Sequence, residues 1–303
     1  MFHRFSSSNE QQYNYFNSSL FVSKYGLEKL IITCLKLGFE FCDLSTKNLL
    51  KPKTIYITID DGYVDFLDNA LPIFEKYGIP FTIFVNKKFV KKEALAWWEA
   101  IELLSNTQRE KVRTFVSKIL TVRGIEVSSL RENILELDHS DFVITLEFLM
   151  SLLNLNQKIK LQNLFMDVRQ LTTLSKNPLC MLGCHSVSHF NLTKLSPPTL
   201  RKEIIDDYDF LKQITHNVSK FFCIPYGSPK EFNTEILLEI RACGFEYSLT
   251  SCHGALQRRL PKSALRRLYV SPNFGIKQLL FILLKENMKD FLNWVYKIKP
   301  KNN

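Results

Sequence analysis

The chain has 303 residues, of which 46% are hydrophobic and 23% are charged. This composition excludes a disordered protein and fits one large or two small globular domains. No apolar run reaches the roughly 18 residues that a membrane-spanning helix needs, and the first residues lack the apolar segment of a signal peptide. We therefore expect a cytoplasmic location, with docking on the inner face of the membrane as the alternative.

The formal net charge is +10, from 40 Lys and Arg against 30 Asp and Glu. A basic surface favours anionic partners. No nucleic-acid motif accompanies it, so we interpret it as solvated surface and expect no nucleic-acid partner. The seven cysteines are odd in number and form no Cys-x-x-Cys pair, which indicates reduced thiols instead of a disulfide framework. The sequence does not reveal the oligomeric state.

Short β-branched or aromatic segments that end at turn residues predict strands along the chain. Helical patterns separate several of them, notably over 66–77, 198–214 and 234–243. This alternation is typical of an α/β protein with a parallel sheet covered by helices, and the number of units favours a distorted (β/α) barrel over an open sheet. The predicted strands are 54–60, 80–85, 179–184, 220–224, 245–250 and 265–271.

Residues 91–163 interrupt this alternation, because their apolar residues recur at helical spacing without a clear strand pattern. We predict a helical insertion within a barrel domain that spans 1–275. Residues 276–303 have an amphipathic pattern with basic ends. They are predicted to form a C-terminal helix that packs on the barrel, with peripheral membrane contact as the alternative.

Asp60 and Asp61 end the first predicted strand, and Gly62 permits a sharp turn after them. At the carboxyl end of a parallel strand both carboxylates can reach one pocket, where α/β proteins bind their ligands. Their repulsion requires a positive charge nearby, such as a metal ion, or a proton on one of them. A turn with helix N-capping is the simpler explanation of an isolated Asp-Asp-Gly.

His185 follows another apolar segment, and His189 comes four residues later, so one helical turn would bring both imidazoles to the same side. Two imidazoles and a carboxylate are a ligand set of catalytic zinc. Two unrelated histidines, one of them in the core, are the alternative. Pro225-Tyr226-Gly227 ends a further strand in a tight turn, which can present a backbone N–H to an oxyanion.

In this order and at strand ends, TIDDG, HSVSH and PYG resemble the first three motifs of the polysaccharide deacetylase family, the NodB-homology domain or carbohydrate esterase family 4. FHRF, ALPIFEKYGIPFTIFV, WWEAIE, GFEYSLT and LRRLYVSP extend the resemblance over most of the chain. The resemblance implies a distorted (β/α) barrel. It also implies a hydrolase that removes N- or O-acetyl groups from glycans with a divalent metal ion, usually Zn²⁺.

Carried over residue by residue, the resemblance implies that Asp61, His185 and His189 hold the metal. Asp60 is then the general base that activates the attacking water, and the backbone N–H of Tyr226 stabilises the oxyanion. One aspartate would bind the ion while its neighbour accepts a proton.

The sequence departs from the family pattern in two places. Cys223 stands where many members carry an arginine that pairs with the base, and no Leu-x-His motif with an acid histidine follows Thr250. FHRF resembles the Tyr-His-Arg stretch of a subgroup that modifies exopolysaccharides, so His3 is the predicted acid, with a disordered terminal histidine as the alternative. Arg267 is predicted to be a surface or structural arginine, with replacement of the missing arginine as the alternative.

Trp97 and Trp98 could stack on a sugar ring. Adjacent helical positions diverge by about 100°, so we expect at most one of them in a sugar groove and the other in the core.

The predicted function is metal-dependent hydrolysis of N-acetyl groups on an N-acetylhexosamine, in an envelope polysaccharide or its precursor. An O-acetyl esterase or a small-sugar deacylase would use the same site. A metal-free carbohydrate-binding relic would explain the two departures from the family pattern. A nuclease or metallophosphoesterase fits less well, because such sites usually hold two metals with more ligands.

Overall fold

The structure, a computed structural model, describes residues 1–7, 18–45, 49, 51, 53–126, 128–256 and 264–270. Its strands are β1 (Arg4–Ser6), β2 (Phe21–Ser23), β3 (Glu40–Phe41), β4 (Thr54–Ile55), β5 (Ile57–Ile59), β6 (Phe81–Val85), β7 (Cys180–Cys184), β8 (Val218–Cys223), β9 (Tyr247–His253) and β10 (Ala264–Arg267). Its helices are α1 (Lys24–Lys36), α2 (Asp65–Asn69), α3 (Leu71–Tyr77), α4 (Lys87–Val90), α5 (Trp97–Leu103), α6 (Asn106–Val122), α7 (Leu130–Glu136), α8 (His139–Ser151), α9 (Leu155–Gln162), α10 (Val168–Leu174), α11 (Pro197–Ile214) and α12 (Thr234–Ala242), with 3-10 turns η1 (Ser18–Leu20) and η2 (Leu192–Lys194). The predicted helix at 276–303 lies outside the described residues.

Six strands form the main sheet, in the order β10-β9-β8-β7-β6-β5. Every neighbouring pair is parallel, so the carboxyl ends of the strands lie at one edge, where ligand sites of α/β proteins form. All five residues of β6 are buried, as expected for a strand covered on both faces. The strands predicted at 80–85, 179–184, 220–224, 245–250 and 265–271 correspond to β6, β7, β8, β9 and β10, with ends that differ by a few residues. The single strand predicted at 54–60 is instead two strands, β4 in a pair with β3 and β5 in the main sheet.

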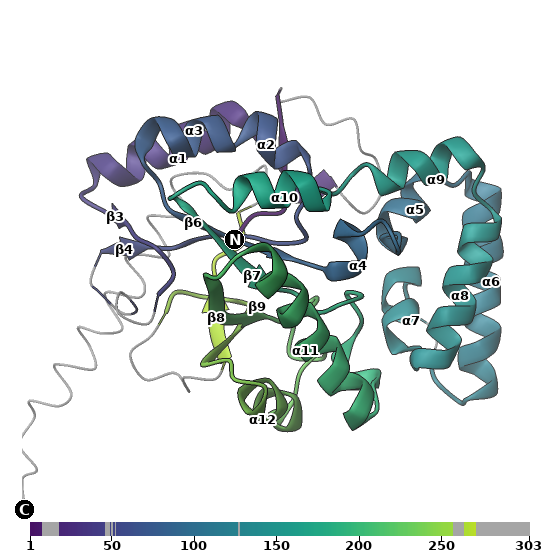
Figure 1. Ribbon diagram of the computed structural model, residues 1–303. Helices are drawn as coiled ribbons and strands as arrows, with labels where there is room; N and C mark the ends of the chain where they lie inside the picture. The colour runs from purple at the N-terminus through teal and green to yellow at the C-terminus, as the bar shows by residue number, and fades with distance from the viewer. Residues whose placement is uncertain are drawn as a thin grey trace, which may run out of the picture.

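The N-terminal residues bridge the two edges of this sheet. Phe2 donates its N–H to the Thr58 carbonyl oxygen (2.9 Å) and accepts from the Asp60 N–H (3.0 Å), next to β5. On the other side, the Val270 N–H donates to the Met1 carbonyl oxygen (3.1 Å), just after β10. The terminus therefore lies against the sheet in Figure 1, and the sheet curls into the predicted distorted barrel.

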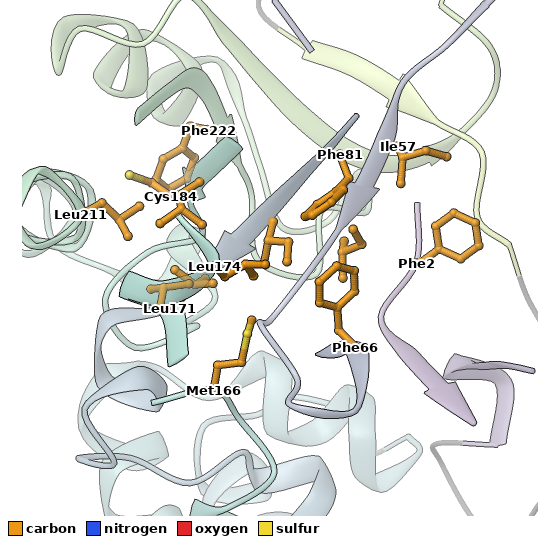
Figure 2. Packing of buried hydrophobic residues seen from close by; sticks show 14 of the residues in the cluster. Phe2, Ile57, Phe66, Phe81, Met166, Leu171, Leu174, Cys184, Leu211 and Phe222 are labelled. Atoms are coloured by element: carbon orange, nitrogen blue, oxygen red, sulfur yellow. The ribbon is translucent and has the colours of Figure 1, made fainter. Parts of the chain in front are cut away.

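The main core fills the space between the sheet and its covering helices (Figure 2). Phe81 of β6 packs its ring 5.1 Å from that of Phe66 and 5.3 Å from that of Phe74. In the same core cluster, α11 buries Leu200, Ile204 and Leu211, which recur at helical spacing. The alternate strand positions Phe84, Phe221 and Leu249 pack in a second cluster on the opposite face. Packing on both faces holds the strand ends, and therefore the loops that follow them, in fixed positions.

Helices α5 to α9 lie between β6 and β7 in the chain and stand beside the sheet in Figure 1. They have a hydrophobic core of their own, in which the stacked rings of Phe115 and Phe148 (4.5 Å) join α6 to α8. Capping boxes begin α6 at Ser105, α7 at Ser129 and α9 at Asn154. These helices occupy 97–162, within the range predicted for the insertion.

Two further parts of the fold differ from the predictions. The short parallel pair β1 and β2, with α1 after it, was not predicted, because three-residue strands are too short to show a period. The single helix predicted over 66–77 is two helices that meet at Ala70, because Pro72 has no N–H to continue the first one. None of the helices in the described ranges combines the length and apolar character needed to cross a membrane.

Candidate active site

The loops at the carboxyl edge of the sheet hold several residues in the left-handed region of backbone space. Asp61 (φ 70°), Ser186 (φ 67°), His189 (φ 54°) and Tyr226 (φ 59°) all have positive φ angles. Each such non-glycine residue costs about 1–3 kcal/mol, and strain of this kind clusters at functional sites. Three of the four are residues that the sequence predicted to be functional.

Glycines make two of these turns possible. Gly62 follows Asp61 with φ +73°, and a Cβ atom there would lie 2.7 Å from Val85 Cγ1. Gly227 has φ +64°, and a Cβ atom there would lie 2.7 Å from the Ser251 backbone nitrogen. Both positions therefore require glycine.

Residues 185–189 form a loop, so the predicted helical turn between the two histidines is wrong. Glu203 of α11 holds the loop by accepting from the Ser188 N–H (2.9 Å) and hydroxyl (2.7 Å). Its carbonyl oxygen accepts from the Val187 N–H (3.1 Å). The loop nevertheless brings the two imidazole rings to 4.8 Å between centroids.

The predicted metal ligands converge on one point. Asp61 Oδ1 lies 3.4 Å from His185 Nε2 and 3.3 Å from His189 Nε2. His185 Nδ1 lies 2.7 Å from the Cys223 carbonyl oxygen, which can only accept, so Nδ1 carries a proton and the lone pair of the neutral ring is on Nε2. Asp61 Oδ1 is buried without a hydrogen-bond partner in the described part of the chain. These acceptor atoms fit a divalent cation.

The protonation of these groups also reflects their burial. Burial alone lowers the pKa of His185, but the Cys223 and Asp61 side chains raise it well above 6.5. For His189, burial dominates and lowers the pKa. Burial alone would raise the pKa of Asp61, but the two neighbouring histidines bring it well below 3.8. A proton and a cation therefore compete for the His185 lone pair, while Asp61 stays ionised.

Asp207 of α11 supports His185 from behind and was missed in the sequence. Its fully buried carboxylate accepts from the backbone N–H groups of His185 (2.9 Å) and Lys87 (2.9 Å). Burial raises its pKa well above 3.8 despite these bonds. An acidic residue on the apolar face of a helix, three positions after Ile204, was the available signal.

Arg267 forms a two-pronged ion pair with Asp60, with N–O distances of 2.7 and 2.8 Å. Arg267 is therefore not a surface arginine: its side chain is 7% exposed and is the counter-ion of the predicted base, as the alternative of replacing the missing arginine requires. Burial alone would raise the pKa of Asp60, but Arg267 and His185 lower it to about 2. At the position of the missing family arginine, the Cys223 thiol is buried beside this pair.

His3 lies on the open side of the same carboxylate. Its Nε2 is 3.9 Å from Asp60 Oδ2, its ring is 17% exposed, and its edge meets the ring of Tyr269. Burial lowers the pKa of His3 more than Asp60 and Asp61 raise it. Residues 1 and 2, which bridge the two edges of the sheet, thus place His3 at the site. The burial of His3 there keeps its imidazole neutral.

Tyr226 stands at the centre of a tight turn that the Gly227 N–H closes on the Pro225 carbonyl oxygen (2.6 Å). In the described part of the chain, no acceptor takes the Tyr226 N–H. The phenol ring lies 4.6 Å from the His189 ring, and its hydroxyl accepts from Trp97 Nε1 (2.8 Å). The turn therefore has a free N–H next to a predicted metal ligand.

Both tryptophans are buried, which is consistent with the expectation that at most one of them lies in a sugar groove. Trp98 packs its ring 4.7 Å from that of His189 and donates to the Tyr63 hydroxyl (2.8 Å). Tyr63 in turn donates to Glu99 (2.8 Å), which also accepts from Arg4 (3.1 Å). This buried network ties α5 of the insertion to the N-terminal segment that carries His3.

The fold and the site define a parallel-sheet barrel of the deacetylase type. The family model described as polysaccharide deacetylase matches residues 47–129 and 142–248, which is more than half of the chain. The chain thus belongs to the polysaccharide deacetylase family, and the resemblance seen in its motifs is confirmed.

The names of proteins that are similar to this chain agree with this family assignment. YxkH of Bacillus subtilis (strain 168), a protein named for the same family, is 22% identical over 224 residues, which is 74% of this chain and 53% of YxkH. The chain therefore spans about half the length of this relative. The Streptococcus pyogenes deacetylase PplD, solved in complex with acetate, superimposes with a TM-score of 0.55 at 19% identity over 93% of this chain and 95% of that one. A de-N-acetylase from Aggregatibacter actinomycetemcomitans gives 0.57 at 13% identity, over 93% and 97%. These two structures support the fold.

Proposed function

We propose that this protein is a metal-dependent deacetylase that hydrolyses N-acetyl groups on N-acetylhexosamine units of a glycan. One observation carries the proposal: Asp61 Oδ1 and the Nε2 atoms of His185 and His189 converge, buried, beside a second carboxylate that Arg267 holds ionised. Family membership supplies the glycan as the class of substrate.

Asp61, His185 and His189 would hold the divalent cation, with Zn²⁺ as the expected ion. Such a cation, when bound, polarises the acetyl carbonyl and lowers the pKa of a bound water toward about 7. Asp60 accepts the proton of the attacking water. Its low pKa keeps it ionised and ready, although the same ion pair weakens it as a base.

Tyr226 and His3 act on the substrate from opposite sides in this proposal. The free Tyr226 N–H donates to the oxyanion that develops on the acetyl carbonyl. His3 must first gain a proton, and Asp60, 3.9 Å away, can pass on the proton that it takes from the water. His3 then donates this proton to the departing nitrogen. Because burial lowers its pKa in the resting site, His3 becomes an effective acid only when negative charge builds up on the substrate beside it.

The same groups could also hydrolyse an O-acetyl ester. An activity assay therefore has to decide between the N-acetyl and the O-acetyl linkage. The argument for an inactive relic is weaker than the sequence suggested, because Arg267 occupies the role of the missing arginine. A histidine likewise stands at the site without a C-terminal Leu-x-His motif, since His3 lies 3.9 Å from the base.

The test is acetate release from a panel of N-acetylhexosamine oligomers and an O-acetylated glycan, with and without a chelator. We expect release from the N-acetylated members, its loss with the chelator, and its recovery on addition of Zn²⁺. Asp60→Asn should lose turnover while retaining about one metal ion per chain, whereas the exposed control Asp209→Asn should behave as wild type. Chelator-resistant release, or full activity of Asp60→Asn, would contradict the proposal.

A further inference from the structure

Three consecutive residues of α5, a helix of the insertion, contact three different parts of the candidate site. Trp97 donates to the hydroxyl of Tyr226 (2.8 Å), and Trp98 packs its ring 4.7 Å from that of His189. The third, Glu99, accepts from the N-terminal segment that carries the proposed acid. Successive helical positions diverge by about 100°, so one turn of α5 can face all three parts at once.

The proposed acid itself is weakly held. Within the described ranges, the ring of His3 makes no hydrogen bond: its Nδ1 is buried without a partner, and its Nε2 lies 3.9 Å from Asp60 Oδ2. Its edge meets the ring of Tyr269 at 5.9 Å between centroids. The place of His3 therefore depends on how the chain on either side of it is held.

Arg4, the next residue, carries a buried guanidinium that spans two carboxylates. Its Nε donates to Asp65 Oδ2 (2.8 Å), and its Nη1 donates to Glu99 Oε1 (3.1 Å). The other oxygen of Asp65 accepts from the Phe5 N–H (2.9 Å). The two acids belong to different elements, α2 and α5, and together they leave the planar guanidinium little freedom.

Glu99 is the acid that links this guanidinium to the insertion. The central carbon of the guanidinium lies between two rings, 4.5 Å from that of Phe21 and 4.6 Å from that of Tyr63. The Tyr63 hydroxyl donates to the same oxygen of Glu99 (2.8 Å) as Arg4 does. Removal of the Glu99 carboxylate would take one partner from a buried guanidinium and one from a buried hydroxyl, which favours their displacement.

We infer that Glu99 is a positioning residue for the acid, and that it acts through Arg4 to hold His3 beside Asp60. The inference rests on the proposed function, which gives His3 its role. A reacting group that is misplaced by about 1 Å can cost about 10²-fold in rate. Loss of Glu99 should therefore slow the step that needs the acid and leave the metal in place.

The test compares two substrates that differ in their need for an acid. The amine of an N-acetylhexosamine oligomer must be protonated to leave, whereas 4-nitrophenyl acetate releases a stable phenolate without a proton. Glu99→Leu removes the carboxylate and keeps an apolar side chain. We expect it to lower kcat on the oligomer by up to about 100-fold. The KM, the metal content and the rate on 4-nitrophenyl acetate should stay unchanged.

Three further variants sharpen the comparison. Glu99→Gln keeps an oxygen that can accept from Arg4 and Tyr63, so it should retain most of the activity. Arg4→Lys keeps the charge but loses the fork that spans two carboxylates. It should show the same selective loss, and it replaces Glu99→Leu if that variant does not fold. Glu110→Leu is the matched control, because Glu110 also lies in the insertion and pairs with Arg113 (3.0 Å) but is 63% exposed. It should behave as wild type.

A double-mutant cycle separates positioning from general stability. In a His3→Gln background there is no acid to position, so Glu99→Leu should cause no further loss of kcat on the oligomer. Additive losses would overturn the inference. Equal losses on the two substrates, or loss of the metal, would also overturn it, because they would assign Glu99 to the metal centre or to the fold. The cycle decides alone if 4-nitrophenyl acetate is not hydrolysed.

Amide hydrogen exchange gives a readout that is independent of turnover. If wild type releases no acetate from the oligomer, the proposed function fails. Glu99→Leu should still speed exchange in residues 1–6 and leave that of β6 unchanged, whereas Glu110→Leu should change neither. Unchanged exchange in residues 1–6 would refute the positioning role of Glu99 whether or not the enzyme is active.

Discussion

The ion pair between Arg267 and Asp60 makes a quantitative prediction for Arg267→Met. Methionine keeps an apolar stem but removes both N–O contacts (2.7 and 2.8 Å) from a carboxylate that is only 3% exposed. Removing one partner of a buried pair costs about 3–5 kcal/mol, because the other charge stays buried without compensation. We therefore expect the free energy of unfolding at pH 7 to fall by roughly this amount.

The pKa shift of Asp60 gives a lower bound on this loss of stability. The direction of the shift gives the sign of its pH dependence. Its fall from 3.8 to about 2 corresponds to roughly 2.5 kcal/mol, since one unit of pKa is about 1.4 kcal/mol. This stabilisation is fully present above pH 3.8 and is lost as the pH falls from 3.8 through 2. In Arg267→Met the burial of Asp60 raises its pKa instead, so the difference between variant and wild type should narrow as the pH falls from 7 to 4.

Urea unfolding with a chelator present measures this difference without a contribution from cation binding. Arg266→Met is the matched control, because Arg266 is exposed on the same strand, and a surface charge is worth about 0–1 kcal/mol. Arg267→Met should also cost less in an Asp60→Asn background, where no buried charge remains. Equal losses for Arg266→Met and Arg267→Met at pH 7 would refute the reasoning.

Three further substitutions test the site. His3→Gln should lower kcat by about 10²–10⁴ through loss of the proton donor while metal content stays unchanged, and normal turnover would assign the acid elsewhere. His189→Gln should lose the bound metal on gel filtration, as measured by elemental analysis, whereas one ion per chain would contradict its role as a ligand. Gly227→Ala should destabilise the protein by about 1–3 kcal/mol, because its Cβ meets Ser251 at 2.7 Å. Gly244→Ala, with open space around its Cβ, should cost less in the same thermal unfolding assay.

The sequence predicted the strand ends well because buried parallel strands have a strong apolar signature and stop at turn residues. The same signature located Asp60, His185 and Tyr226 at one edge of the sheet. It could not show how the loops after the strands bend. Ser186 and His189 adopt left-handed conformations in a loop that Glu203 of α11 holds through Val187 and Ser188, and the local pattern does not contain these contacts.

Partnerships between distant residues were also beyond the sequence pattern. Arg267 pairs with Asp60 across 207 positions, and nothing near either residue indicates the other. Asp207 carried a weak signal, since an acid on the apolar face of a helix must have a partner, but the partner itself, the His185 N–H, appears only in the folded structure. The two three-residue strands near the N-terminus were missed because propensity has little weight over so few residues.

Residues 1–3 and 267–270 meet at the seam of the barrel, so the proposed proton donor and the counter-ion of the proposed base come from opposite ends of the described chain. During synthesis on the ribosome, Asp60 emerges long before Arg267 and must wait, hydrated and unpaired, for the last strand to dock. A product that is terminated between His189 and Arg267 would keep every predicted metal ligand but would lack the guanidinium of Arg267. Such a product would also lack β10 at one edge of the sheet, so the complete site requires both ends of the described chain.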